Sequence, residues 1–316
     1  MSTVTNDKDV STAASLRAGL LVAVVSSVAF GLSGVLASPL LDAGWSAGAL
    51  VLVRIGVAAV CVLPLGVAAL RGRWDLLRRN VRVLVAYGVL AVAGTQFCYF
   101  AALSYMEVGP ALLIEYTAPA AVVVWWWVRH GQAPSALTVA GAALAATGLV
   151  LVLDVASGAE VSVPGVLWAL GAMVGVASYF IISADTSNGL PPMVLAAGGL
   201  LVGALVLALL GVVGLMSLDA STAPVSYADV EVPSWLALVA LGVVTTAVAY
   251  TTGIVAGRWL GSRLMSFVGL LEVVAAVGLA WLLLDQAPRA VQLVGGLLVL
   301  AGVVAVKLGE RAPVRS

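Results

Sequence analysis

Long apolar runs, separated by short stretches rich in Pro, Gly and charged residues, follow one another along the whole chain. Each run has about 20 residues, enough for a helix to cross a hydrocarbon core of roughly 30 Å. The breaks place the runs at residues 17–37, 46–70, 83–104, 109–129, 135–153, 164–184, 192–216, 234–257, 262–284 and 288–307. We therefore expect an all-α membrane protein with ten transmembrane helices.

The composition supports this fold class. Of the 316 residues, 62% are hydrophobic and only 9% are charged, too few to cover the surface of a soluble protein of this length. The formal net charge is zero, so no overall field favours nucleic acid as a partner. Cys61 and Cys98 both lie inside apolar runs, where we expect buried thiols rather than a disulfide or metal ligands.

Motifs for several kinds of chemistry are missing from the sequence. His130 is the only histidine and lies at the edge of a run, which excludes a metal site or catalytic pair built on histidine. No Walker-type glycine loop occurs, so the chain does not itself hydrolyse ATP. We expect no enzyme, and neither a metal nor a cofactor.

The charges between the runs indicate an orientation. If both termini face the cytoplasm, the cytoplasmic segments hold most basic residues, as the positive-inside rule requires. These are Lys8, Arg17, Arg71, Arg73, Arg78, Arg79, Arg82, Arg129, Arg258, Arg263, Lys307, Arg311 and Arg315. The opposite connections carry Asp42, Glu107, Asp154, Glu160, Asp219, Asp229, Glu231 and Asp285. We expect a multi-pass plasma-membrane protein whose longest outer connection, 217–233, is a loop.

The fifth and tenth runs are near copies. "GQAPSALTVAGAALAATGLVLVL" starts at Gly131 and "DQAPRAVQLVGGLLVLAGVVAVK" starts at Asp285. Aligned without gaps, they share Gln132/Gln286, Pro134/Pro288, Gly141/Gly295 and Gly148/Gly302. A repeat of five helices reverses direction in its second copy, so we predict two inverted repeats, 17–154 and 163–308. A disordered cytoplasmic tail is expected at 1–16 and a second cytoplasmic tail at 309–316.

Two segments carry a family resemblance. "ALLIEYTAPAAVVVWWWVRHGQAPS" and "SFVGLLEVVAAVGLAWLLLDQAP" resemble the fourth and ninth spans of EamA-type exporters in the drug/metabolite transporter superfamily. Val273 stands where the second repeat of that family usually has a proline, and the turns read Gly131-Gln132 and Asp285-Gln286 instead of Gly-Glu. The resemblance covers nearly the whole chain.

Resemblance and duplication together suggest a function. An inverted duplication is typical of secondary transporters, in which two similar halves alternately open a central path. The resemblance implies export of small metabolites, amino acids or related compounds, along a path lined by the first, third, fourth, sixth, eighth and ninth spans. A drug or nucleotide-sugar carrier is the alternative within the superfamily, and a non-transporting membrane scaffold is the alternative outside it. An ion gradient or the substrate's own gradient would supply the energy.

Charges inside the apolar runs are the first candidates for a transport site. Arg54, Glu115 and Glu272 lie within predicted helices, where a charge costs about 2.5–3.5 kcal/mol at the centre. Arg54 and Glu115 lie at similar depth and could form a structural salt bridge. Alternatively, Glu115 faces the cavity, where it binds an amino group or takes a proton. Glu272 lies near the midplane, either as a proton-coupling carboxyl or as a neutral group bonded between helices.

Polar and aromatic side chains supply further candidates. Three pairs each share one helical face: Gln96 with Tyr99, Tyr179 with Ser183, and Thr246 with Tyr250. We predict that they line the substrate or proton pathway, although each could instead make a hydrogen bond between helices. Pro119, in the middle of its span, is the candidate hinge.

Overall fold

The computed structural model describes residues 4–118, 127–128, 135–152, 162–184, 187–253, 256 and 271–309. Helix lies within each of the ten predicted spans. The elements are α1 (Val4–Asp42), α2 (Ala47–Leu70), α3 (Asp75–Arg79), α4 (Val81–Ala86), η1 (Tyr87–Gly94), α5 (Thr95–Leu103), α6 (Val108–Glu115), α8 (Ala136–Val152), α9 (Val163–Ala184), α10 (Pro192–Val212), β1 (Val225–Tyr227), β2 (Val230–Val232), α11 (Ser234–Gly242), η3 (Val243–Val248), α13 (Leu271–Leu284) and α14 (Ala290–Gly309).

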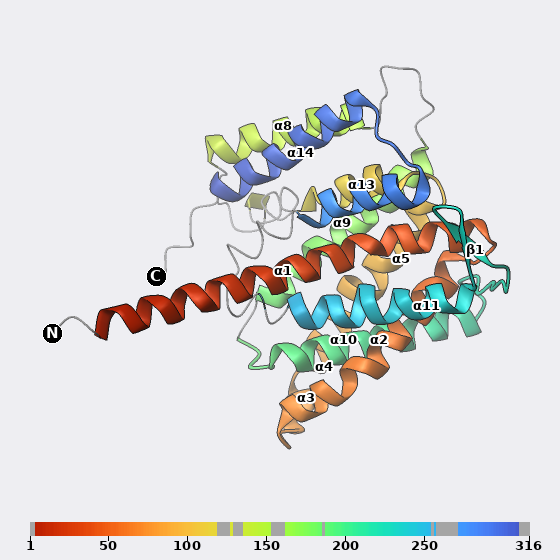
Figure 1. Cartoon of the computed structure of the whole chain (residues 1–316). Helices are drawn as coiled ribbons and strands as arrows, with labels where there is room; N and C mark the ends of the chain where they lie inside the picture. Colours follow the sequence, from red (N-terminus) through yellow and green to blue (C-terminus); the bar gives the residue numbers. More distant parts are fainter. Residues whose placement is uncertain are drawn as a thin grey trace.

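The described helices are apolar enough for a membrane. By length and composition, five could cross it: Ala18–Asp42, Ala47–Leu70, Val81–Leu103, Pro192–Val212 and Ser234–Gly253. Four shorter apolar helices accompany them, at Ala136–Val152, Val163–Tyr179, Leu271–Leu284 and Ala290–Val306. These helices form the bundle of Figure 1, in which the long helix α1 extends beyond the others toward the N-terminus.

Packing between helices follows the duplication. Between the repeats, α1 is equivalent to α9, α6 to α13, and α5 to α11 with η3. The contact of α1 with α13 therefore corresponds to the contact of α9 with α6. The contact of α5 with α9 corresponds to the contact of α11 and η3 with α1. Helix α2 packs on its equivalent α10, and α8 on its equivalent α14. The same pairs thus recur when the two repeats are exchanged, as an inverted duplication requires.

Glycine makes the contact between α8 and α14 close. Gly141 faces Gly302 and Gly148 faces Gly295, so the two helices run antiparallel. A Cβ added to Gly148 would lie 2.6 Å from the carbonyl oxygen of Gly295. This distance is too short for a real contact, so only glycine fits at this position. Backbones approach this closely where small residues line a membrane interface. Figure 1 shows the pair at one edge of the bundle.

Equivalent spans of the two repeats also share an irregularity. The third span changes to a π-helix at η1, and the eighth does so at η3. Wider turns of this kind leave backbone carbonyls that side chains can reach, and they are frequent at functional sites. Threonines take up some of these carbonyls: the hydroxyl of Thr95 donates to Leu90 O (3.1 Å) and that of Thr245 donates to Leu241 O (2.6 Å).

The connection between α10 and α11 corrects the expected loop at 217–233. Strands β1 and β2 pair antiparallel across Ala228 and Asp229, which have φ of 47° and 63°. Positive φ at both central residues suits the right-handed twist of a tight hairpin. The Tyr227 hydroxyl donates to Leu36 O at 2.8 Å, and burial raises its pKa, so it stays protonated. Ala228 N donates to Leu283 O at 3.0 Å.

The hairpin therefore joins the ends of α1 and α13, and we call this end of the bundle the hairpin side.

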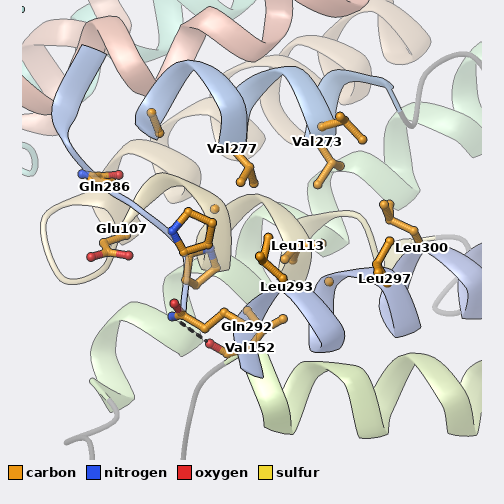
Figure 2. Close-up of a pocket in the computed structure, with 16 residues that line it drawn as sticks. Glu107, Leu113, Val152, Val273, Val277, Gln286, Gln292, Leu293, Leu297 and Leu300 are labelled. Atoms are coloured by element: carbon orange, nitrogen blue, oxygen red, sulfur yellow. Dashed lines mark hydrogen bonds between the residues drawn. The ribbon is translucent and has the colours of Figure 1, made fainter. Parts of the chain in front are cut away.

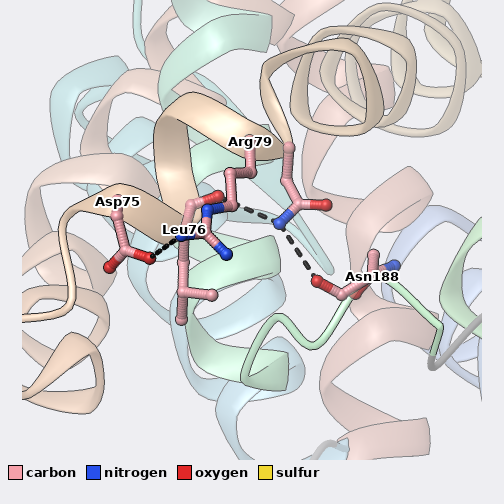
Figure 3. Close-up of polar contacts among 5 residues, drawn as sticks. Asp75, Leu76, Arg79 and Asn188 are labelled. Carbon is pink, nitrogen blue, oxygen red and sulfur yellow. Dashed lines mark hydrogen bonds and ion pairs between the residues drawn. The ribbon is translucent and has the colours of Figure 1, made fainter.

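At the opposite end, a polar contact joins the two repeats. The Asn80 amide nitrogen donates to Leu76 O and to Asn188 O, each at 3.0 Å. Leu76 and Asn188 are labelled in Figure 3. The nearby ion pair of Arg79 with Asp75 (3.4 Å) is exposed and contributes little to stability.

A second expectation, the disordered tail at 1–16, also differs from the structure. Helix α1 begins at Val4 and continues without interruption into the first span. The physical reason lies in the sequence: no Gly or Pro occurs between Val4 and Leu16 to end a helix.

Candidate functional site

Arg54 lies at the centre of the polar interior. Its side chain is 1% exposed, on α2. The Nε atom donates to the Thr246 hydroxyl at 2.6 Å, one Nη donates to the Gln96 side-chain oxygen, and the other donates to the Thr245 carbonyl at 3.0 Å. The guanidinium also lies 5.3 Å from the centre of the Phe100 ring. Every nitrogen of the guanidinium therefore has an acceptor.

These bonds connect three helical segments and both repeats. Arg54 belongs to α2, Gln96 to α5 and Thr246 to η3 of the second repeat. Although both side chains are described, no ion pair joins Arg54 to Glu115, so the structural salt bridge considered from the sequence is absent. The reason is that neutral acceptors on η3 and α5 already hold the guanidinium. Sequence reasoning had placed Gln96 and Thr246 on the pathway but did not connect them to Arg54.

Glu272 has a partner that the sequence analysis missed. The Tyr116 hydroxyl donates to the Glu272 carboxyl at 2.6 Å, which joins the end of α6 to the start of α13. These two helices come from opposite repeats. Tyr116 directly follows Glu115, and this adjacency of a phenol to an intramembrane carboxyl is the signal that could have revealed it.

Glu115 differs from Glu272 in its surroundings. It is 9% exposed, and its Oε2 atom is buried with no hydrogen-bond partner among the described residues. A buried polar group left in this state costs about 1–3 kcal/mol, and more when it is charged. The Arg54 guanidinium interacts electrostatically with both Glu115 and Glu272. The interior thus holds one cation, Arg54, whose nitrogens all donate hydrogen bonds, and two carboxyl groups. One of these, Glu115, has an oxygen that accepts no hydrogen bond from the described residues.

Tyrosines surround this cluster. Tyr99 packs against Phe100, whose ring lies beside the Arg54 guanidinium, and Tyr250 packs edge-on against Phe30 with ring centres 5.2 Å apart. Tyr179 packs against Tyr87 at 6.0 Å. The Tyr99 hydroxyl occupies the space beside Gly34, where a Cβ would lie 2.3 Å from it. Aromatic rings therefore pack around the charged groups.

Two predicted residues are not placed. Pro119 lies outside the described residues, and of Ser183 only the backbone, within α9, is described. Among the described residues, no group of three or more His, Cys, Asp or Glu side chains could hold a metal ion. We call the Arg54, Glu115, Tyr116, Thr246 and Glu272 side chains the central cluster.

The fold and this cluster define a polytopic helical membrane protein built from two inverted five-helix repeats. The family model of the EamA-like transporter family matches residues 17–154 and 163–308. The chain therefore belongs to the EamA-like transporter family, and its members are membrane transporters, not enzymes. The family expected from the two quoted segments is confirmed.

Solved structures share the fold. Twenty-four chains match, among them one described only as "Crystal structure of protein". Its TM-score is 0.62 and its sequence identity is 24%, over 92% of this chain and 97% of its own. Identity at this level shows a common fold and nothing about substrate. No curated protein matches the chain.

Proposed function

We propose that the protein exports small metabolites, amino acids or related compounds, across the plasma membrane by alternating access between its two repeats. The observation that carries the proposal is the central cluster, in which side chains from both repeats meet in a buried interior. Arg54 bonds across the repeat boundary to Thr246, and Tyr116 bonds across it to Glu272. A group bound there would contact both halves and could respond to their relative movement.

The open oxygen of Glu115 supports a role in binding. A carboxylate attracts the amino group of a substrate, or takes up a proton where the surroundings are apolar. Glu272, held by Tyr116, is the second carboxyl in the path and the candidate for proton coupling. We propose that the remaining predicted residues, namely Gln96, Tyr99, Tyr179, Ser183 and Tyr250, line the path and that Pro119 acts as its hinge.

The charge distribution supports an orientation with both termini in the cytoplasm. In that orientation the hairpin side faces outward. A drug or nucleotide-sugar carrier remains the alternative substrate class, because the cluster selects for charge and hydrogen bonding without fixing the size of the substrate. Repeats connected through a buried polar centre favour a carrier over a scaffold.

A substrate screen followed by flux measurement tests the proposal. Amino acids and related metabolites are first compared for thermal stabilisation of the purified protein. Export of a stabilising compound from proteoliposomes is then measured with and without a pH gradient. Glu272→Gln should abolish the dependence on the gradient while expression is kept, whereas the exposed control Glu231→Gln should retain it. Unchanged gradient dependence in Glu272→Gln would dismiss proton coupling at this residue.

A further inference from the structure

An apolar crevice lies apart from the central cluster. It has a volume of about 320 Å³ and lies between α6, α13 and α14. Figure 2 shows Leu113, Val277 and Leu297, one from each of these helices, around the crevice, with Val273 and Leu300 farther along it. Its volume is at the lower end of the range for small-molecule pockets. Glu115 and Glu272 do not line it.

The crevice exists because α14 packs chiefly on α8. The glycine contacts hold these two helices together and leave the face of α14 toward α13 only partly filled. Leu297 and Leu293 are 67% and 51% exposed on this face, and Val274 on α13 is 56% exposed. Within a bilayer, side chains exposed at the level of membrane-spanning helices meet hydrocarbon instead of water. This space is therefore apolar and open to hydrocarbon, as an acyl chain requires.

Polar residues gather only at the mouth of the crevice, on the hairpin side. Gln292 donates to Val152 O at 3.3 Å, and Gln286 accepts from Val108 N at 3.4 Å, so both amides hold the mouth in place. Glu107 offers an exposed carboxyl there. A carboxyl group thus lies at the hairpin-side end of an otherwise apolar crevice.

We propose that this crevice binds one acyl chain of a zwitterionic phospholipid, with the headgroup at the hairpin-side mouth. The headgroup carries an amine, which complements the carboxyl of Glu107 at the mouth. The N-terminus of α14, directly after Arg289, adds backbone N–H groups that favour the phosphate. The bound lipid then fills the gap between the α8–α14 pair and the rest of the bundle.

Photocrosslinking of the full chain tests this site. The protein is reconstituted with phosphatidylethanolamine that carries a diazirine in one acyl chain, irradiated, digested and mapped by mass spectrometry. Crosslinks should concentrate at least fivefold on crevice residues such as Leu113, Val277 and Leu297 over other lipid-facing positions. Glu107→Gln should weaken the labelling, and phosphatidylglycerol with the same diazirine chain should label the crevice less.

Filling the crevice provides the matched comparison. A Cβ on Gly296 would lie 3.6 Å from the Leu113 Cδ1 atom, an ordinary contact, so Gly296→Leu places its side chain in the crevice without a backbone collision. Gly278→Leu adds the same side chain to α13 outside the crevice, where nothing lies within 4 Å. Crevice labelling should fall about fivefold in the first variant and stay unchanged in the second. Val277→Phe fills the same space if Gly296→Leu does not yield monodisperse protein.

Three results would overturn the proposal. Labelling spread evenly over the lipid-facing helices means that no site exists. Crosslinks between two copies of the chain assign the crevice to a dimer contact, and loss of labelling on addition of a transported solute assigns it to the transport path. Because labelling does not require turnover, a failure of the proposed transport function leaves this measurement unaffected.

Discussion

Replacing Arg54 with lysine tests whether the guanidinium fork, rather than a positive charge alone, connects the two repeats. The fork donates to three acceptors around its plane, on Thr246, Gln96 and Thr245. A single ammonium on a straight stem cannot reach all of them, so the variant should lose about two of these bonds. Hydrogen bonds between membrane helices contribute about 0.6 kcal/mol on average and about 1.7 at most. We expect a loss of about 1–3 kcal/mol in the free energy of unfolding.

The assay is reversible unfolding of the purified protein in mixed micelles, followed by tryptophan fluorescence. Thr246→Val removes one acceptor and should cost roughly 0.6–1.7 kcal/mol. The double variant should lose less than the sum of the two, because the same bond is broken twice. Arg82→Lys is the matched control: Arg82 is exposed, and the change should stay within about 0.5 kcal/mol. An Arg54→Lys protein as stable as the unaltered chain would refute the reasoning.

Three further variants and one control test other contacts. Gly148→Ala should cost about 1–3 kcal/mol in the same unfolding assay, because its Cβ would meet the backbone of α14, whereas Gly278→Ala, with open space around it, should be neutral. Tyr116→Phe should cost about 1–3 kcal/mol because it leaves the Glu272 carboxyl without its donor, and an unchanged unfolding free energy would argue against that bond. Tyr227→Phe should increase amide hydrogen exchange in the hairpin, and equal exchange would show that its bond to α1 contributes nothing.

The fold was predictable because the features that determine it are local patterns in the sequence. Apolar runs of membrane-crossing length locate the spans, and the copied Gln-Ala-Pro entry of the fifth and tenth spans reveals the duplication. The glycines that the two copies share, Gly141/Gly295 and Gly148/Gly302, lie where the structure packs α8 closely against α14. The hairpin was missed because a segment of three-residue strands has too few alternating positions to stand out from a loop.

The pairing of side chains was less predictable than their location. Sequence alone identified Arg54, Gln96 and Thr246 as polar positions inside apolar runs, and depth along the helices suggested Glu115 as the partner of Arg54. Depth gives the position of a residue along its helix but not the direction in which its side chain faces. Which face each helix turns inward depends on packing between distant segments, and the change of helix type at η3 brings Thr246 and the Thr245 carbonyl to the guanidinium.

Labelling of a cysteine at Ser33 tests alternating access most directly. Ser33 lies on α1, is 6% exposed, and its hydroxyl is buried without a hydrogen-bond partner among the described residues. Ser33→Cys is placed in a chain that carries Cys61→Ala and Cys98→Ala, and a membrane-impermeant maleimide is applied to right-side-out and to inside-out vesicles. The account predicts reaction from both sides, in proportions that shift when a transported solute is added. Reaction from one side only, whatever solute is present, would contradict it.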